Sequence, residues 1–152
     1  TVLLTTWLEL PWPLPISSMT LMFQEEVAER IVAKPGSKAY GRLSVLANWR
    51  CETEIVYRLP RDAFTPPPKI SSAIVQLRPK ERLDYAPSPL LFRQVTAAAF
   101  GQRRKMLRAS LKALSKDIVA LLTELNIDPT ARAETLEWQD YCRIALALEN
   151  HS

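Results

Sequence analysis

The chain has 152 residues, of which 47% are hydrophobic and 24% are charged, and its formal net charge is +4. This length and composition are those of an ordinary globular protein of one domain or one and a half. No apolar run reaches the roughly 20 residues that cross a bilayer, and the first residues lack the positive charge of a signal peptide. We therefore expect neither a membrane span nor secretion.

Two cysteines, Cys51 and Cys142, are far apart in the sequence and lack the spacing of metal ligands. This usage is typical of two structural thiols in a reduced compartment. We expect a cytoplasmic protein with no metal site.

The first 49 residues predict three helices and one strand. Apolar residues have helical spacing from residue 1 to 10, and Pro11 ends that pattern. Residues 18–23 are typical of a buried strand, and a helix is expected over 24–33. A Pro-Gly-Ser turn then leads into a short helix over 42–49.

Two further segments, 51–59 and 70–77, alternate in the way that half-buried strands do. In the first, we expect Tyr57 to share a face with Ile55 and Leu59. One face of the second is formed by Ala73, Val75 and Leu77. The order of elements predicts the closing half of an α/β sheet whose last two strands are antiparallel.

Residues 80–89 are predicted to form a linker between an α/β part at 1–79 and a helical part at 90–152. The helices expected in the second part cover residues 90–100, 103–114, 117–125 and 136–149. Turn chemistry at Asn126 to Pro129 ends the third of them.

The loop between the last two strands contains three consecutive prolines, Pro66 to Pro68. Proline fixes its own φ and restricts the residue before it, so this loop hardly flexes. Phe64 at its mouth has little conformational freedom left to lose, which suits a ring that stacks on a flat partner. The alternative is a stiff connection with Phe64 packed into the core. The residues alone leave both interpretations open.

Positive charge is concentrated in residues 101–116, which hold six basic side chains and no acidic one. If this segment is helical, Leu107, Leu111 and Leu114 form its buried stripe. The cations that then gather on a neighbouring face are Lys105, Arg108, Lys112 and Lys116. The simplest interpretation is a solvated face, but the lack of acidic partners at i±4 favours a phosphate backbone as the partner. Arg103 and Arg104 could add forked contacts to phosphate or to a base edge.

Four blocks of the sequence resemble the rRNA adenine N6,N6-dimethyltransferases, a class I S-adenosylmethionine-dependent family. Phe64 to Lys69 is similar to the family motif F-x-P-x-P-K. Residues 100–107 (FGQRRKML) are similar to the segment F-x-Q-R-R-K-x-L of the small-subunit branch. The other two blocks are residues 21–30 with 36–45, and residues 132–136. The resemblance covers nearly the whole chain, in order and at family spacing.

The resemblance implies the distal half of a class I methyltransferase (Rossmann-like) sheet followed by a small all-α C-terminal domain. The family's acidic-Gly-x-Gly loop, which binds S-adenosylmethionine, and its catalytic Asn-Leu-Pro-Tyr motif are expected upstream of Thr1. Neither motif occurs in the 152 residues, so no cofactor-binding residue is assigned. Because the chain also starts without Met in mid-pattern, we expect a segment of a longer enzyme that is inactive alone.

The family enzymes are monomers that methylate N6 of two adjacent adenines in small-subunit rRNA of the 30S subunit during ribosome biogenesis. By resemblance, the catalytic residues are Phe64, the platform on which the target adenine stacks, and Pro66 of the proline loop. For Tyr40, packing and substrate contact remain equally open. The residues expected to bind RNA are Lys38, Tyr40, Lys69, Arg103, Arg104, Lys105, Arg108 and Lys112. An open strand edge favours self-association of the segment.

Three alternatives remain. A large-subunit (erythromycin-resistance) dimethyltransferase shares the F-x-P-x-P-K strand pair, although the Gln102 to Lys105 segment favours the small-subunit branch. A non-catalytic rRNA-binding or ribosome-assembly factor would keep the RNA contacts without the cofactor loop. A mitochondrial transcription factor of the same fold is the third, and nothing in the sequence demands it.

Overall fold

The computed structural model describes residues 2–10, 14, 16–81 and 86–150. The regular elements of its first half are α1 (Val2–Leu8), β1 (Met19–Gln24), α2 (Glu25–Val32), α3 (Arg42–Arg50), β2 (Cys51–Leu59), the 3-10 turn η1 (Arg61–Ala63) and β3 (Ser72–Pro79). The helices and strands expected up to residue 79 are therefore all present, in the expected order. Pro11, which was expected to end the first helix, lies outside the described residues.

The three strands form one antiparallel sheet in the order β1-β3-β2. The predicted antiparallel pairing of the last two strands is confirmed, with Thr53 opposite Leu77 and Ile55 opposite Val75. The predicted face of β3 is also confirmed, because Ala73, Val75 and Leu77 are all fully buried while the residues between them are only partly buried. Strand β3 is central and has a hydrogen-bonded neighbour on each side.

Strand β1 is less buried than its apolar sequence predicts. Met19 is buried, but Thr20 is exposed and the Met22 side chain is 56% exposed. The reason lies in the sheet, because β1 pairs only with β3 among the described residues and the Met22 face points away from the helices. The prediction of a fully buried strand is therefore wrong, and β1 is half-buried.

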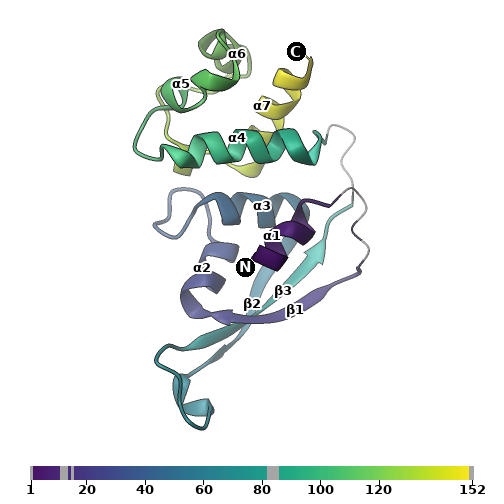
Figure 1. Cartoon of the computed structure of the whole chain (residues 1–152), viewed down its shortest axis with the longest axis vertical. Helices are drawn as coiled ribbons and strands as arrows, with labels where there is room; N and C mark the ends of the chain where they lie inside the picture. The colour runs from purple at the N-terminus through teal and green to yellow at the C-terminus, as the bar shows by residue number, and fades with distance from the viewer. Residues whose placement is uncertain (1, 11–13, 15, 82–85, 151–152) are drawn as a thin grey trace.

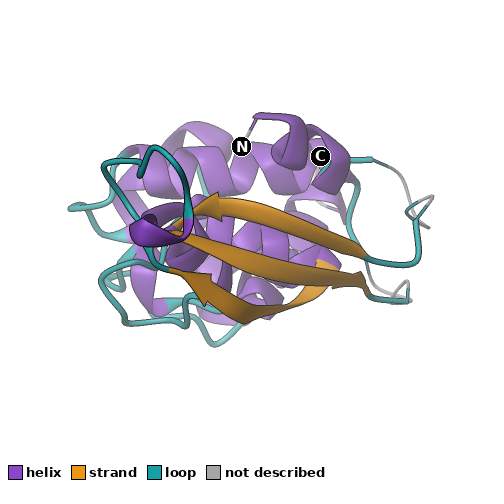
Figure 2. Cartoon of the chain, turned by 90° about the horizontal axis from the view of Figure 1, so that it is seen from below, coloured by secondary structure: helices purple, strands orange, loops and turns teal. Residues whose placement is uncertain are grey.

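Helices cover one face of the sheet, as Figure 2 shows with the strands in front of them. Helix α2 starts with Glu25 and Glu26 in its first turn, where carboxylates suit the helix dipole, and buries Ala28 and Ile31. Helix α3 is buried almost all round, because it lies between the sheet and the C-terminal helices (Figure 1).

Arg50, the last residue of α3, is fully buried. Its guanidinium donates hydrogen bonds to the carbonyl oxygens of Leu8, the last residue of α1, and of Leu10 just beyond it. Burial lowers the pKa of Arg50 to about 10, so the side chain stays charged at neutral pH. This cation therefore ties the end of α1 to the layer beneath it.

The second half of the chain is helical, as predicted. Its elements are α4 (Pro89–Gly101), α5 (Leu107–Ser110), η2 (Lys112–Leu114), α6 (Ile118–Glu124), η3 (Ala133–Thr135) and α7 (Trp138–Asn150). Ser88 caps α4 by accepting a hydrogen bond from the Leu91 amide at 3.2 Å, and Pro89 follows at the first helical position.

The turn chemistry predicted after the third helix is confirmed at Asn126. Asn126 has a φ of 59°, in the left-handed region. Its amide donates to Thr123 O at 3.0 Å, and the Ile127 amide donates to Leu122 O at 2.9 Å. These two hydrogen bonds form a Schellman motif, which satisfies the last carbonyls of α6.

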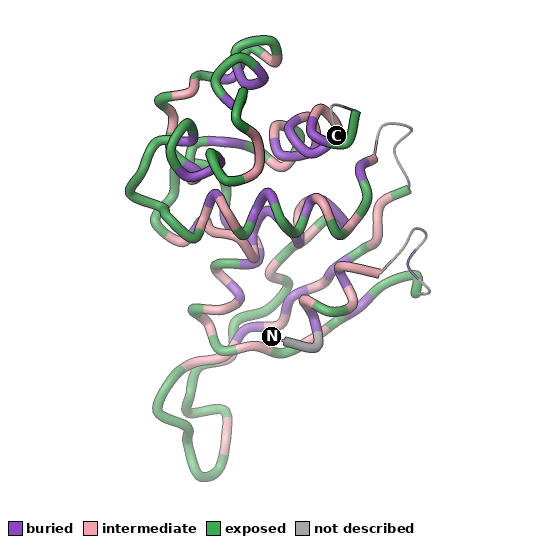
Figure 3. Tube along the Cα trace, turned by 45° about the horizontal axis from the view of Figure 1, so that its top comes forward, coloured by how far each residue is buried: buried purple, intermediate pink, exposed green. Residues whose placement is uncertain are grey.

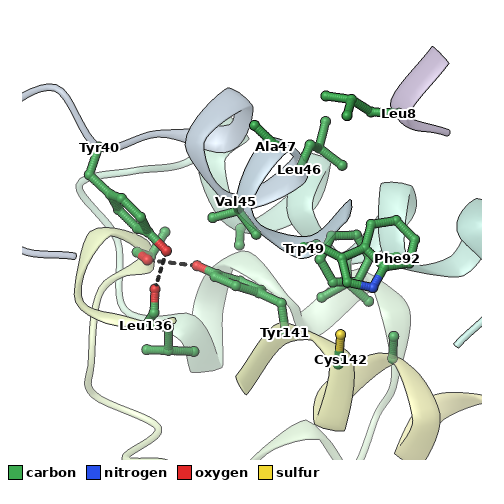
Figure 4. Close-up of a cluster of buried hydrophobic side chains, with 14 of the residues drawn as sticks. Leu8, Tyr40, Val45, Leu46, Ala47, Trp49, Phe92, Leu136, Tyr141 and Cys142 are labelled. Atoms are coloured by element: carbon green, nitrogen blue, oxygen red, sulfur yellow. Dashed lines mark hydrogen bonds between the residues drawn. The ribbon is translucent and has the colours of Figure 1, made fainter. Parts of the chain in front are cut away.

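The two halves share one continuous core. The Trp49 ring of α3 stacks on the Phe92 ring of α4 with centroids 3.9 Å apart and planes 21° apart. Both rings are almost wholly buried, and the close-up in Figure 4 places Cys142 of α7 near them. Part of the predicted linker, residues 82–85, lies outside the described residues, and the division of the chain at 80–89 stays a prediction.

Candidate RNA-binding surface

The β2–β3 hairpin projects beyond the rest of the molecule (Figures 1 and 3), and Phe64 lies in the loop that joins its two strands. Phe64 follows the 3-10 turn with extended backbone, φ −113° and ψ 152°. Its side chain is half-buried, whereas residues 65–70 are all exposed, including Pro66 and Lys69. Phe64 is not among the side chains that make up or pack against the core. Its placement therefore favours the exposed platform over the packed connection.

A β-bulge interrupts β2 just before the hairpin leaves the body. Ile55 pairs with Val75 and Tyr57 pairs with Ile74, so Val56 has no partner in the register. The extra residue changes the faces of the side chains that follow, and Tyr57 is 60% exposed. The prediction that Tyr57 shares a face with Ile55 is therefore wrong.

The predicted helix over 103–114 is not formed. Helix α4 ends at Gly101, residues 102–105 make a turn, and only residues 107–110 are α-helical. The cause is tertiary, because the Leu107 amide donates to Ala131 O at 2.8 Å and the Arg108 amide donates to Pro129 O at 3.0 Å. A continuous helix would direct both amides to carbonyls four residues earlier.

The basic residues thus form a cluster around a turn and not one helix face. We call the exposed cations of residues 103–112 the basic turn; they are Arg103, Arg104, Lys105, Arg108 and Lys112. Leu107 and Leu111 are fully buried between these cations and anchor the segment to the core. In the described part of the chain, Arg103 is the member of the basic turn that has an ion pair, at 4.0 Å from Glu134.

The basic turn meets the loop that precedes α3. An Arg103 guanidinium nitrogen lies 3.9 Å from the point that a Cβ on Gly41 would occupy. In the same loop the Gly36 amide donates to Glu134 O at 2.9 Å, and Lys38 is exposed. Segments around residues 38, 103 and 134 therefore lie side by side, and their exposed cations belong to one surface.

Tyr40 lies in this loop but points inward. Its side chain is 2% exposed, and its hydroxyl donates to Leu136 O at 2.6 Å (Figure 4). The neighbouring Tyr141 hydroxyl donates to Ala133 O, also at 2.6 Å. Burial raises the pKa of both phenols well above the usual range. Of the two roles open for Tyr40, its placement favours packing: it anchors the loop that presents Lys38.

A polar depression of about 330 Å³ lies where the sheet meets α7, and sequence reasoning missed it. Lys80 lies in its wall, donates to Asn48 O and places its ammonium 4.3 Å from the centroid of the Trp138 ring. Burial lowers the pKa of Lys80. Its position just after β3 gave no signal in the sequence, because its partners come from α3 and α7. The contacts make Lys80 a link between the two halves of the chain.

The described residues contain no group of three or more His, Cys, Asp or Glu side chains that could hold a metal ion. They also contain no helix that is both long and apolar enough to cross a membrane. The three glycines stand apart from one another, Gly36 and Gly41 on either side of Lys38 and Gly101 at the end of α4. They cannot form the cofactor loop of a class I methyltransferase, so the residues present do not fit S-adenosylmethionine by themselves.

Comparison with known proteins decides the family. Residues 1–150 match the family described as ribosomal RNA adenine dimethylase. The chain belongs to this family. It is 55% identical over 148 residues to ribosomal RNA small subunit methyltransferase A of Cereibacter sphaeroides, which covers 97% of this chain and 53% of the relative. It is 53% identical over 149 residues to the protein of that name in Roseobacter denitrificans, with the same coverage.

Solved structures of methyltransferases have the same fold. A dimethyladenosine transferase from Plasmodium falciparum aligns with a TM-score of 0.75 and 26% identity, over 95% of this chain and 62% of that one. The 23S rRNA methyltransferase ErmE aligns with a TM-score of 0.62 and 22% identity, over 96% of this chain and 59% of that one. The predicted fold class, part of a methyltransferase α/β fold followed by helices, is thus confirmed.

The resemblance to the small-subunit rRNA adenine dimethyltransferases, which four sequence blocks indicated, is confirmed as well. The chain spans about half the length of the curated relatives it matches.

Proposed function

We propose that this chain is the substrate-handling part of an rRNA adenine N6,N6-dimethyltransferase that acts on small-subunit rRNA. In this proposal the basic turn and Lys38 bind the RNA backbone, and Phe64 stacks on the adenine that is to be methylated. S-adenosylmethionine supplies the methyl groups in the complete enzyme. Family membership and the names of the relatives support the reaction class.

The observation that carries the proposal is the placement of Phe64. A large aromatic side chain stands outside the core, on a stiff proline loop that projects into solvent. A base must leave its stack before chemistry can reach it, and an aromatic platform lowers that cost by about 1–3 kcal/mol. Methyl transfer to N6 is an in-line displacement that needs positioning more than a strong base. A side chain that loses little conformational entropy on binding is suited to positioning the adenine.

The basic turn supports RNA binding by charge and shape. Its exposed cations can neutralise phosphates and release counterions. Lys69 extends the positive charge onto the hairpin beside Phe64. These groups are expected to recognise the shape and charge of the RNA backbone more than its base sequence.

A spectroscopic titration tests the proposal. The chain contains four phenylalanines, so replacing them with 4-fluorophenylalanine gives few fluorine NMR signals, and Phe64→Leu assigns one of them. We expect an RNA hairpin with two adjacent adenines in its loop to shift the Phe64 signal, because a stacked base changes the field at the ring. The same hairpin with two uridines is the control. Binding without any shift of the Phe64 signal would contradict the platform.

A second candidate, a non-catalytic rRNA-binding factor, is favoured by the lack of a cofactor loop among the residues present. We expect no measurable binding of S-adenosylmethionine to the 152-residue chain in calorimetry. Binding in the micromolar range would contradict the view that the cofactor site lies in other residues. Methyl transfer to the RNA hairpin after addition of the part of a relative that this chain does not cover would separate the enzyme from the binding factor.

A further inference from the structure

At its base, the hairpin that carries Phe64 is attached to the body by the pairing of β3 with β1, which reaches Ser72, and by contacts with helix α2. Residues 60–70 lie beyond the helical layer, and all except Phe64 are exposed (Figure 3). The bulge at Val56 weakens the ladder between β2 and β3 just below this point. We call the ends of β2 and β3 that border the loop the two arms of the hairpin. The direction in which Phe64 points therefore depends on the contacts that these arms make with the body.

Arg58 makes the contact of the β2 arm. Its Nη1 atom lies 2.6 Å from Glu29 Oε1 and 3.3 Å from Glu25 Oε1. Glu25 and Glu29 are four residues apart on α2, so they occupy one face of the helix and repel each other when unpaired. The Arg58 guanidinium lies against both carboxylates and removes that repulsion.

Glu25 also makes the contact of the β3 arm. Its backbone amide donates to Ser71 O at 3.0 Å, immediately after the proline loop. One residue at the start of α2 therefore holds both arms, through its amide on one side and its carboxylate on the other. The end of β2 is otherwise held through β3, since Arg58 pairs with Ala73 and Leu59 pairs with Ser72 in the sheet. The Arg58 ion pairs add a direct link from the β2 arm to α2.

We propose that Arg58 is a positioning residue: through Glu25 and Glu29 it sets the angle at which the hairpin presents Phe64 to the base. This inference rests on the proposed function of Phe64. An exposed ion pair by itself contributes little to stability, typically about 0–1 kcal/mol. Here the side chains are about half exposed, and one guanidinium joins two carboxylates across two elements. The consequence is expected in the direction of the loop and not in the folding of the chain.

The test compares Arg58→Met with Arg30→Met, in fluorine NMR titrations with the adenine-containing RNA hairpin. Arg30 is a matched control, because its side chain is equally exposed, at 53%, and its ion pair with Glu26 lies within α2. In Arg58→Met we expect the RNA-induced shift of the Phe64 signal to fall by about half or more, since the variant loses the ion pairs that join the β2 arm to α2. Arg30→Met should keep the full shift.

A double-mutant cycle assigns the effect to the contact. Glu29→Gln should reduce the shift less than Arg58→Met, and the double variant should be no worse than Arg58→Met alone. Additive losses would show that Arg58 acts on the RNA directly, and an unchanged shift in Arg58→Met would overturn the inference. If the wild-type chain binds the RNA without any shift of the Phe64 signal, the proposed function fails instead, so the two failures are distinguishable.

Discussion

The junction of α3, α4 and α7 and the Phe64 hairpin use aromatic residues in opposite ways. In the junction, Trp49 and Phe92 stack face to face and have almost no exposed surface. In the hairpin, Phe64 stands outside the core, and Tyr57 is 60% exposed. A rigid, fully packed centre thus supports a projecting loop whose side chains are free to meet a partner. Binding residues are often found on loops that a rigid scaffold holds in place.

Removing an aromatic ring from each region gives the largest contrast. Trp49→Ala should lower the free energy of unfolding by about 3–5 kcal/mol, because it leaves a cavity against Phe92. Phe64→Ala should cost less than about 1 kcal/mol, since little core packing is lost. Urea unfolding followed by circular dichroism measures both values. Equal losses in the two variants would mean that Phe64 is part of the core.

The basic turn extends the comparison between buried and exposed regions, because its cations should contribute to RNA binding and not to the core. Arg103→Ala combined with Lys105→Ala should weaken RNA binding about tenfold and lower the slope of log affinity against log salt by roughly 1.5, as two lost phosphate contacts do. Fluorescence anisotropy at several salt concentrations measures the slope. Arg78→Ala with Arg93→Ala removes the same charge outside the basic turn and should leave the slope nearly unchanged. An unchanged slope in the first pair would identify a merely solvated face.

The two thiols give an effect that is seen only at high pH, and it belongs to the buried region. Burial raises the pKa of Cys51 to about 11 and that of Cys142 to about 12. Unfolded thiols lose their protons at lower pH, so the folded chain should lose stability as the pH rises from about 9 to about 12. Below that range the full contribution is present. Urea unfolding across this range should show the loss, and Cys51→Ala with Cys142→Ala should reduce it.

The chemical reactivity of the two thiols tests their burial at constant pH. At pH 8 both thiols should resist a thiol reagent in the folded chain and react once urea unfolds it, because both side chains are fully buried. Rapid labelling of either thiol without unfolding would contradict their placement.

Local chemistry predicted several features correctly. The alternation of Ala73, Val75 and Leu77 indicated the buried face of β3, since side chains on a strand alternate between two faces. Asn126 ended α6 in the left-handed conformation that its side chain tolerates. The family resemblance was visible because its motifs are short and contiguous in the sequence.

Predictions that needed distant partners were the ones that failed. The 103–114 segment has good helical spacing, but its amides are held by carbonyls more than 20 residues later, at Ala131 and Pro129. Tyr57 follows a bulge that no local pattern signals. Strand β1 is mostly apolar in sequence, yet its residues alternate between buried or half-buried and exposed.

The sequence by itself determined which groups this protein offers: an aromatic ring before a stiff proline loop, and a concentration of cations without acidic partners. These are properties of neighbouring residues, so no folding is needed to see them. The tertiary structure decided how the groups are presented. It turned the expected helix into a basic turn, buried Tyr40 against Leu136 and placed Arg58 between two carboxylates of α2. Each outcome depends on a contact between residues far apart in the chain, and only the folded packing brings them together.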